Sequence, residues 1–155
     1  MIRKFHFSQF LFLAAFTALL AACSTAKITD QEAQRLRTMP PAPGTALVYF
    51  VRPLAGAAIR RFRVTCDGTP IGLTNGKRYI YTMVKPGKHD FISKAENKDE
   101  LSIVLNADST YFIEQIPQMG LFSARNVIQR VDEGKGRKKL SKCKLSGDCP
   151  AYTNQ

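Results

Sequence analysis

Residues 62–68 read Phe62-Arg63-Val64-Thr65-Cys66-Asp67-Gly68. Apolar and polar side chains alternate over the first five positions, which is typical of a β-strand with one buried face. The dipeptide after them is a turn signal, because glycine accepts a positive φ and aspartate tolerates one. The sequence here predicts a strand that ends in a tight turn.

The same combination of short apolar runs and turn residues recurs from residue 45 to residue 131. Together with Asp67-Gly68, the other turn signals support hairpins, and they are Asn75-Gly76, Lys85-Pro86-Gly87-Lys88 and Asp108-Ser109. Since no long helical pattern separates the runs, we expect an all-β domain, a small antiparallel β-sandwich of about seven to eight strands, with a barrel as the related alternative. The expected strands are 46–52, 61–67, 78–84, 89–94, 101–106, 110–116 and 126–131, with a short piece at 71–73.

Composition agrees with one small, basic domain. The chain has 155 residues, with 23 Lys plus Arg against 12 Asp plus Glu, which gives a net charge of +11. A hydrophobic fraction of 45% is too high for an intrinsically disordered chain. The apolar runs are too short for a protein that crosses the membrane several times.

The first 22 residues have the layout of a secretory signal peptide. Basic residues at positions 3 and 4 precede an apolar stretch over residues 10–20, which is shorter than a spanning helix requires. The stretch ends in Leu20-Ala21-Ala22-Cys23, which resembles the bacterial lipobox. The alternative is an ordinary cleaved signal followed by a chance cysteine.

The lipobox resemblance implies that Cys23 carries a covalent diacylglycerol and an N-acyl chain, and we expect no other cofactor. Ser24 then favours the outer membrane over the inner, so we expect a lipid-anchored protein that faces the periplasm of the cell envelope. Residues 23–44 are polar and rich in proline towards their end. We expect them to form a flexible tether, although the spacing of Thr29 and Glu32 allows a short, marginal helix over residues 30–37.

Residues 132–155 form a basic tail in which a short helix over residues 132–140 is weakened by two glycines. A basic surface favours contact with anionic envelope material such as phospholipid headgroups. The alternative is a cationic helix face that is merely solvated. The tail lacks the interleaved aromatic residues that stack on bases, which argues against nucleic acid. The candidate residues for an anionic surface are Lys135, Arg137, Lys138, Lys139, Lys142 and Lys144.

Two cysteines lie close together in this tail. Export would place them in an oxidising compartment, so we expect a disulfide between Cys143 and Cys149, with two free thiols as the alternative. Zinc is less favoured there, because a structural site needs four ligands and the exported chain has one histidine. We expect no metal site.

Cys66 and His89 are the remaining candidates for chemistry. Cys66 shares the apolar face of its strand, which indicates a buried, unreactive thiol. His89 alternates in phase with Phe91, which directs it towards the core or its rim. The alternative is a small hydrolase or thiol enzyme that uses this pair. No recognisable hydrolase, phosphate-binding or dinucleotide motif supports a small-molecule substrate.

Several of these segments, in their order and spacing, resemble an uncharacterised bacterial lipoprotein family, the domain of unknown function 2846. The resemblance implies a small β-sandwich on a lipid anchor and no established reaction. Cys66 stands where such domains more often have an aliphatic residue. The matching segments lie between residues 46 and 145 and are 46–53, 64–68 with 71–72, 75–76, 84–89, 110–112, 131–133 and 136–137.

We therefore expect a non-catalytic, membrane-anchored envelope lipoprotein that acts as a binding or structural module. Its expected partners are the bilayer, through the anchor, and an envelope protein or anionic polymer, through the tail or an exposed sheet edge. Residues 120–122, Gly-Leu-Phe, are a candidate contact loop. The expected divisions are 1–22, 23–44, 45–131 and 132–155.

Overall fold

A computed structural model describes residues 28–55, 60–119 and 124–153. The chain divides into two units, Met1–Asp30 and Gln31–Gln155. The second unit contains all the strands that the structure describes.

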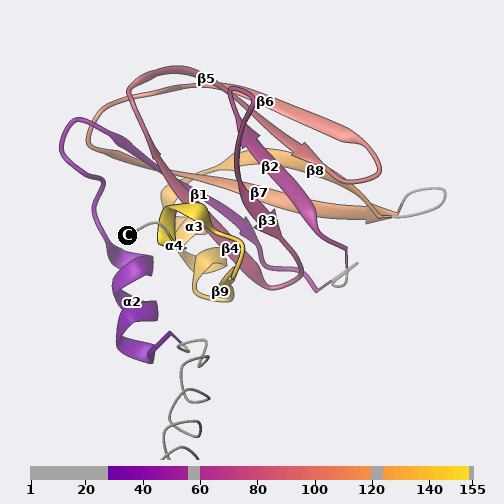
Figure 1. The fold of residues 1–155 in the computed structure, drawn as a ribbon, viewed down its shortest axis with the longest axis horizontal. Coiled ribbons are helices and arrows are strands. Elements are labelled where there is room, and N and C mark those ends of the chain that lie inside the picture. Colours follow the sequence, from indigo (N-terminus) through magenta and orange to yellow (C-terminus); the bar gives the residue numbers. More distant parts are fainter. Residues whose placement is uncertain (1–27, 56–59, 120–123, 154–155) are drawn as a thin grey trace, which may run out of the picture. The chain divides into compact units, whose positions relative to one another are not determined.

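In the described residues, nine strands form two sheets, which confirms the predicted all-β sandwich (Figure 1). The first sheet has the order β8-β7-β1-β4-β9 and the second β3-β2-β5-β6. Most neighbours are antiparallel, but β1 runs parallel to β7, and β4 runs parallel to β9. The strands are β1 Ala46–Arg52, β2 Phe62–Cys66, β3 Thr69–Thr74, β4 Arg78–Val84, β5 Gly87–Lys94, β6 Lys98–Leu105, β7 Ser109–Met119, β8 Ala124–Val131 and β9 Lys144–Leu145.

Strand β1 lies at the centre of the first sheet, and all seven of its residues are buried. Phe50 packs against Phe91 of the second sheet, with ring centroids 5.4 Å apart. Its neighbour Tyr49 points to the other face, where its hydroxyl donates a hydrogen bond to the carbonyl of Leu36 at 2.6 Å. Because both faces of β1 are covered, its sequence is apolar from Ala46 to Val51 instead of alternating.

The outer face of the first sheet is covered by three short helices, α2 Asp30–Thr38, α3 Glu133–Leu140 and α4 Pro150–Thr153. Leu36 of α2 is fully buried. A flexible tether was expected over residues 23–44, but residues 30–38 form a helix that packs on the sheet, so this part of the prediction is corrected. Residues 23–27 lie outside the described residues. An isolated nine-residue helix is only marginally stable in water, and here the burial of Leu36 against the sheet stabilises α2.

The turn signals are used in two different ways. Asp67 and Gly68 have φ values of 49° and 81°, and they form the predicted hairpin between β2 and β3. The other three predicted turns join strands of different sheets, namely β3 to β4, β4 to β5 and β6 to β7. The hairpin interpretation of those three signals was wrong, because turn residues reverse the chain without determining which strand it pairs with next.

The interior between the sheets contains a hydrogen-bonded polar chain. The Thr74 hydroxyl donates to Gln115 Oε1 at 2.6 Å, and Gln115 Nε2 donates to the Ser93 hydroxyl at 2.8 Å. All three residues are buried. Buried polar groups are tolerated where each finds a partner, so this chain links β3, β7 and β5.

The segment after α3 bridges the edges of the two sheets. Strand β9 pairs with β4, after which the Ser146 hydroxyl donates to the carbonyl of Leu73, on β3, at 2.7 Å. The amide of Leu73 in turn donates to the carbonyl of Asp148 at 3.1 Å. Gly72 permits this approach, because a Cβ there would lie 2.5 Å from the Asp148 carbonyl oxygen. The sequence did not predict this segment.

Candidate functional site

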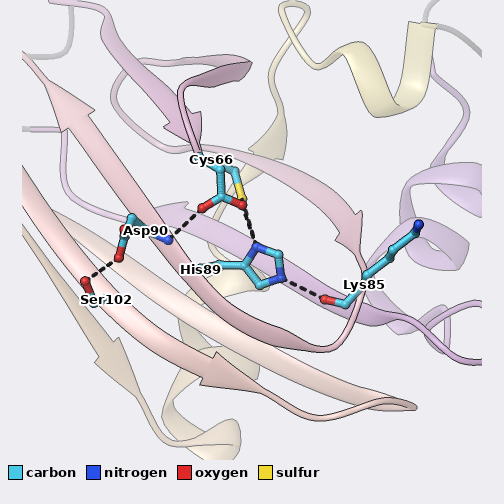
Figure 2. A network of polar contacts seen from close by, with 6 residues as sticks. Cys66, Lys85, His89, Asp90 and Ser102 are labelled. Atoms are coloured by element: carbon cyan, nitrogen blue, oxygen red, sulfur yellow. Dashed lines mark hydrogen bonds and ion pairs between the residues drawn. The ribbon is translucent and has the colours of Figure 1, made fainter.

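A cluster of three chemically different side chains lies where the end of β2 meets β5. Figure 2 shows two of them, Cys66 and His89, with their polar contacts. Cys66 is the last residue of β2, Asp67 begins the β2–β3 turn, and His89 lies on β5. Strands β2 and β5 are neighbours with Cys66 opposite Phe91, which brings His89 close to the turn. The pairing of β2 with β5 therefore creates the cluster.

The histidine ring is held from both of its nitrogens. Nδ1 lies 2.6 Å from Asp67 Oδ2, and Nε2 lies 2.8 Å from the carbonyl oxygen of Lys85. Since both partners are acceptors, the contacts fit an imidazolium that donates from each nitrogen. Burial lowers the pKa of His89, but the bonds to Asp67 and to the Lys85 carbonyl outweigh that effect, and the pKa is raised.

The aspartate is held just as closely. Its Oδ1 accepts a hydrogen bond from the amide of Asp90 at 2.9 Å, and its own amide donates to the carbonyl of Asp90 at 2.9 Å. The bond from the Asp90 amide, followed by the bond from His89, lowers the pKa of Asp67. Ser102 on β6 donates a hydrogen bond to the Asp90 carboxylate, so β6 is linked to the cluster through Asp90 (Figure 2).

The thiol of Cys66 is near the histidine but is not activated by it. Its Sγ lies 3.8 Å from His89 Nδ1, while the residue is 6% exposed. Burial raises the pKa of Cys66 to about 12, and the Asp67 carboxylate contributes to the rise. A nucleophilic cysteine needs a lowered pKa and a base with a free nitrogen. Here Nδ1 faces the aspartate as well as the thiol, and Nε2 is bonded to Lys85.

The cluster does offer three metal-ligating atoms. One sulfur, one carboxylate oxygen and one imidazole nitrogen lie within 4.8 Å of one another. The sequence suggested Cys66 and His89 as a pair and Asp67 only as a turn residue. One sequence signal bears on this cluster, because an aspartate directly follows the strand Phe62–Cys66. However, His89 is far from both Cys66 and Asp67 in the sequence, so the sequence alone does not show that the three side chains are in contact.

Comparison with known proteins identifies the family. The family described as "Protein of unknown function (DUF2846)" matches residues 42–127, which is more than half of the chain. The chain belongs to the DUF2846 family. It is also similar to an uncharacterized protein of Haemophilus influenzae, with 27% identity over 134 residues, 83% of this chain and 78% of that relative. The predicted family resemblance is thereby confirmed.

The range that matches DUF2846 contains the whole Cys66–Asp67–His89 cluster and ends before α3. The match therefore covers β1 to β7 and the beginning of β8. The basic tail, which includes the bridging segment after α3, lies beyond the matched residues, although the sequence resemblance was expected to continue to residue 145.

The six candidate basic residues of the tail divide into two groups. Lys135, Arg137 and Lys139 form ion pairs with Asp132, Glu133 and Glu114 respectively. The Lys139–Glu114 contact is 2.6 Å long and its carboxylate is almost fully buried. The other three basic residues, which make no ion pair with the described residues, are Lys138, Lys142 and Lys144.

The two tail cysteines are free thiols in the structure, and both are buried. The predicted disulfide between Cys143 and Cys149 is not formed in this structure and stays a prediction. The short segment between the two cysteines pairs with β4 and bonds to β3. Cys149 Sγ points instead towards the carbonyl of Tyr81, 3.6 Å away.

The lipobox and the candidate contact loop fall outside the part of the chain that the structure describes. These residues are Leu20, Ala21, Ala22 and Cys23, together with residues 120–122. Within the described part of the chain, every helix is too short or too polar to cross a membrane.

A shallow hollow of about 380 Å³ lies where the bridging segment meets β3 of the DUF2846 domain. Its wall includes Arg63, and the nearby side chain of Arg61 forms an ion pair with Asp148 at 3.4 Å. Apart from Arg63 and Asp148, the lining residues are apolar or small, which offers few groups to orient a ligand. The lining residues are Arg63, Pro70, Gly72, Leu73, Gly147, Asp148, Cys149 and Pro150.

Proposed function

We propose that this protein is a non-catalytic lipoprotein of the bacterial cell envelope, in which a lipid on Cys23 anchors the DUF2846 domain to the outer membrane on the periplasmic side. The observation that carries the proposal is the sequence Leu20-Ala21-Ala22-Cys23 at the end of a signal-like segment. An acylated cysteine would bury two or more chains, and more than one chain is needed for stable anchoring.

The docking of α2 would keep the domain close to the bilayer. Leu36 is buried and Tyr49 bonds to its carbonyl, so the folded part begins near Asp30. Residues 24–29 then connect the anchor to α2, and six extended residues span at most about 20 Å. A linker this short would limit the orientations of the domain relative to the membrane.

The contacts of α2 also support a basic surface next to this helix. We define the free basic face as Lys138, Lys142 and Lys144. Two of these residues flank Cys143, whose carbonyl accepts a hydrogen bond from Arg37 of α2 at 2.8 Å. The face therefore adjoins the helix that leads to Cys23. Lysines near an anionic surface each contribute about 1 kcal/mol of attraction at low salt. The face would bind anionic headgroups or an anionic envelope polymer.

The non-catalytic part of the proposal is supported by the Cys66 environment. A buried thiol with a raised pKa is a poor nucleophile, and both nitrogens of His89 are engaged by acceptors, which leaves it unable to serve as a general base. The enzyme alternative that uses Cys66 and His89 would require the histidine to leave Lys85 and Asp67.

Metabolic labelling with a fatty-acid analogue tests the anchor. We expect label on the wild-type protein and none on Cys23→Ala, which should also lose membrane association. Cys149→Ala is the matched control, because its thiol is buried and should not affect labelling. Label that persists in Cys23→Ala, or wild-type protein that leaves the membrane in a high-salt wash, would contradict the proposal.

Sedimentation with anionic phospholipid vesicles tests the free basic face. We expect Lys138→Glu/Lys142→Glu to weaken binding and to reduce its salt dependence. Lys135→Glu/Arg137→Glu changes the charge equally but alters residues that are already paired, so it should weaken binding less. Equal losses in both variants would indicate a response to net charge alone.

A further inference from the structure

We propose that Cys66, Asp67 and His89 together bind one divalent transition-metal ion of the zinc type. This inference goes beyond the anchoring proposal and does not depend on it, because all three residues belong to the folded domain. It also departs from the expectation, drawn from sequence, that the chain has no metal site.

The donor set determines the class of ion. A thiolate and an imidazole select zinc and similar borderline ions, whereas calcium and magnesium prefer oxygen ligands alone. Zinc sites built from three protein ligands keep a fourth position for water or another ligand. The cluster therefore corresponds to an open site rather than to a closed, four-ligand structural site.

The spacing of the donor atoms is close to what such an ion requires. Sγ of Cys66 lies 3.8 Å from His89 Nδ1 and 3.7 Å from Asp67 Oδ2. A tetrahedral ion at about 2.3 Å from sulfur and about 2.1 Å from nitrogen and oxygen separates these atoms by roughly 3.4–3.6 Å. The two distances that involve sulfur already fit within a few tenths of an ångström.

The third distance, between Nδ1 of His89 and Oδ2 of Asp67, is that of a hydrogen bond. Nδ1 and Oδ2 are 2.6 Å apart, with a proton between them. An ion that replaces this proton would need the pair to separate by about 0.8 Å. Asp67 can supply that movement, because its side chain is 51% exposed and lies in a turn.

The histidine and the aspartate are already oriented by groups outside the site. The Lys85 carbonyl accepts from Nε2, which leaves Nδ1 directed towards Asp67 and Cys66. The Asp90 amide holds the second oxygen of Asp67. Metal-bound histidines and carboxylates usually have such partners, and their loss typically weakens metal binding about 10–100-fold.

Binding would replace protons with the ion. The proton on Nδ1 of His89 and the proton on Sγ of Cys66 both leave, and the ion then bonds to a neutral imidazole, a thiolate and a carboxylate. The positive charge of the ion stabilises the thiolate that burial otherwise disfavours. Solvent reaches the site from the side of Asp67, while Cys66 stays buried.

Titration of the purified, chelator-treated protein with Co²⁺ and Zn²⁺ tests the proposal. Cobalt bound to a thiolate gives a charge-transfer band in the near ultraviolet, which reports the sulfur ligand directly. We expect this band at one ion per chain, displacement of cobalt by zinc, and release of roughly two protons per ion near neutral pH. No band, or no binding at one ion per chain, would overturn the proposal.

Variants assign the ligands. We expect Cys66→Ala to lose the band and Asp67→Asn to bind at least about tenfold more weakly. Asn tolerates the φ of 49° at this turn, so Asp67→Asn keeps the proposal testable if Cys66→Ala does not fold. Cys143→Ala and Cys149→Ala are the controls and should keep the band. A band that survives Cys66→Ala, or affinity unchanged in Asp67→Asn, would overturn the assignment.

Discussion

Gly136 of α3 rests directly on the ring of Phe112 in β7. A Cβ added at Gly136 would lie 2.2 Å from Cγ of Phe112. The ring has little room to move, because it stacks on Tyr49 with centroids 5.4 Å apart. The glycine that weakens α3 as a helix therefore lets α3 lie flat on the sheet.

Gly136→Ala should destabilise the protein by about 1–3 kcal/mol, because an added methyl group overpacks the contact with Phe112. Gly134→Ala in the same helix is the matched control. Its Cβ would meet no atom closer than 3.5 Å, and alanine favours the helix by up to about 1 kcal/mol. Chemical denaturation of both variants measures the difference, and equal stabilities would contradict the packing described.

Tyr49→Phe should loosen α2 from the sheet. The change removes the 2.6 Å bond to the Leu36 carbonyl and leaves that buried acceptor without its donor, at a cost of about 1–3 kcal/mol. Hydrogen exchange in residues 31–38 should accelerate. Tyr81→Phe removes a comparable bond to the Ala151 carbonyl, so it should loosen α4 and leave α2 protected.

Gln115→Leu should cost about 1–3 kcal/mol, because it leaves the hydroxyls of Thr74 and Ser93 buried without this partner. Thr74→Val added to Gln115→Leu should cost less than the sum of the two single changes. Urea denaturation of the single and double variants gives the coupling energy, which we expect to be at least about 0.5 kcal/mol. Additive costs would mean that Thr74 and Gln115 do not interact.

Stability should fall as pH rises above an ordinary thiol pKa of about 8.5. Burial raises the pKa of Cys143 to about 11, so between these values the unfolded chain releases a proton that the folded chain retains. Each such proton lowers the free energy of unfolding by up to about 1.4 kcal/mol per pH unit. Cys143→Ala should flatten the dependence, and an unchanged slope would show that this thiol ionises normally.

Thiol-specific reagents should react slowly with the native protein and rapidly after denaturation, because Cys66, Cys143 and Cys149 are buried and reduced. Mass spectrometry of the alkylated, denatured protein should find all three modified. A mass lower by two hydrogens across Cys143 and Cys149 would instead support the disulfide that the spacing of the two residues suggested.

Local sequence patterns predicted the strands well but not their neighbours. Alternation and turn residues placed β2 and its hairpin with Asp67 and Gly68 within a residue or two. Sheet order depends on contacts between distant segments, so the parallel pairing of β1 with β7 had no local signal. The two-residue strand β9 is likewise defined by its partner, β4.

The three-residue cluster escaped prediction for the same reason. The patterns around Cys66 and His89 correctly indicated side chains directed towards the core, and Asp67 was correctly predicted in a turn. The three side chains come together because β2 pairs with β5, although β3 and β4 lie between these two strands in the sequence. Similarly, the expected tether contained the right helix, but its docking depends on Tyr49, a residue beyond it in the chain.

The parallel pairing of β1 with β7 also has a consequence for the order of assembly. The innermost strand, Ala46–Arg52, needs one neighbour from residues 109–119 and cover from residues 133–140. Contacts between segments this distant in sequence slow folding, because the entropy of closing a long loop is lost before the contacts can stabilise the chain. A nascent chain would thus leave this apolar strand partly uncovered until almost all of the chain had been synthesised, which would make the strand a natural substrate for a chaperone.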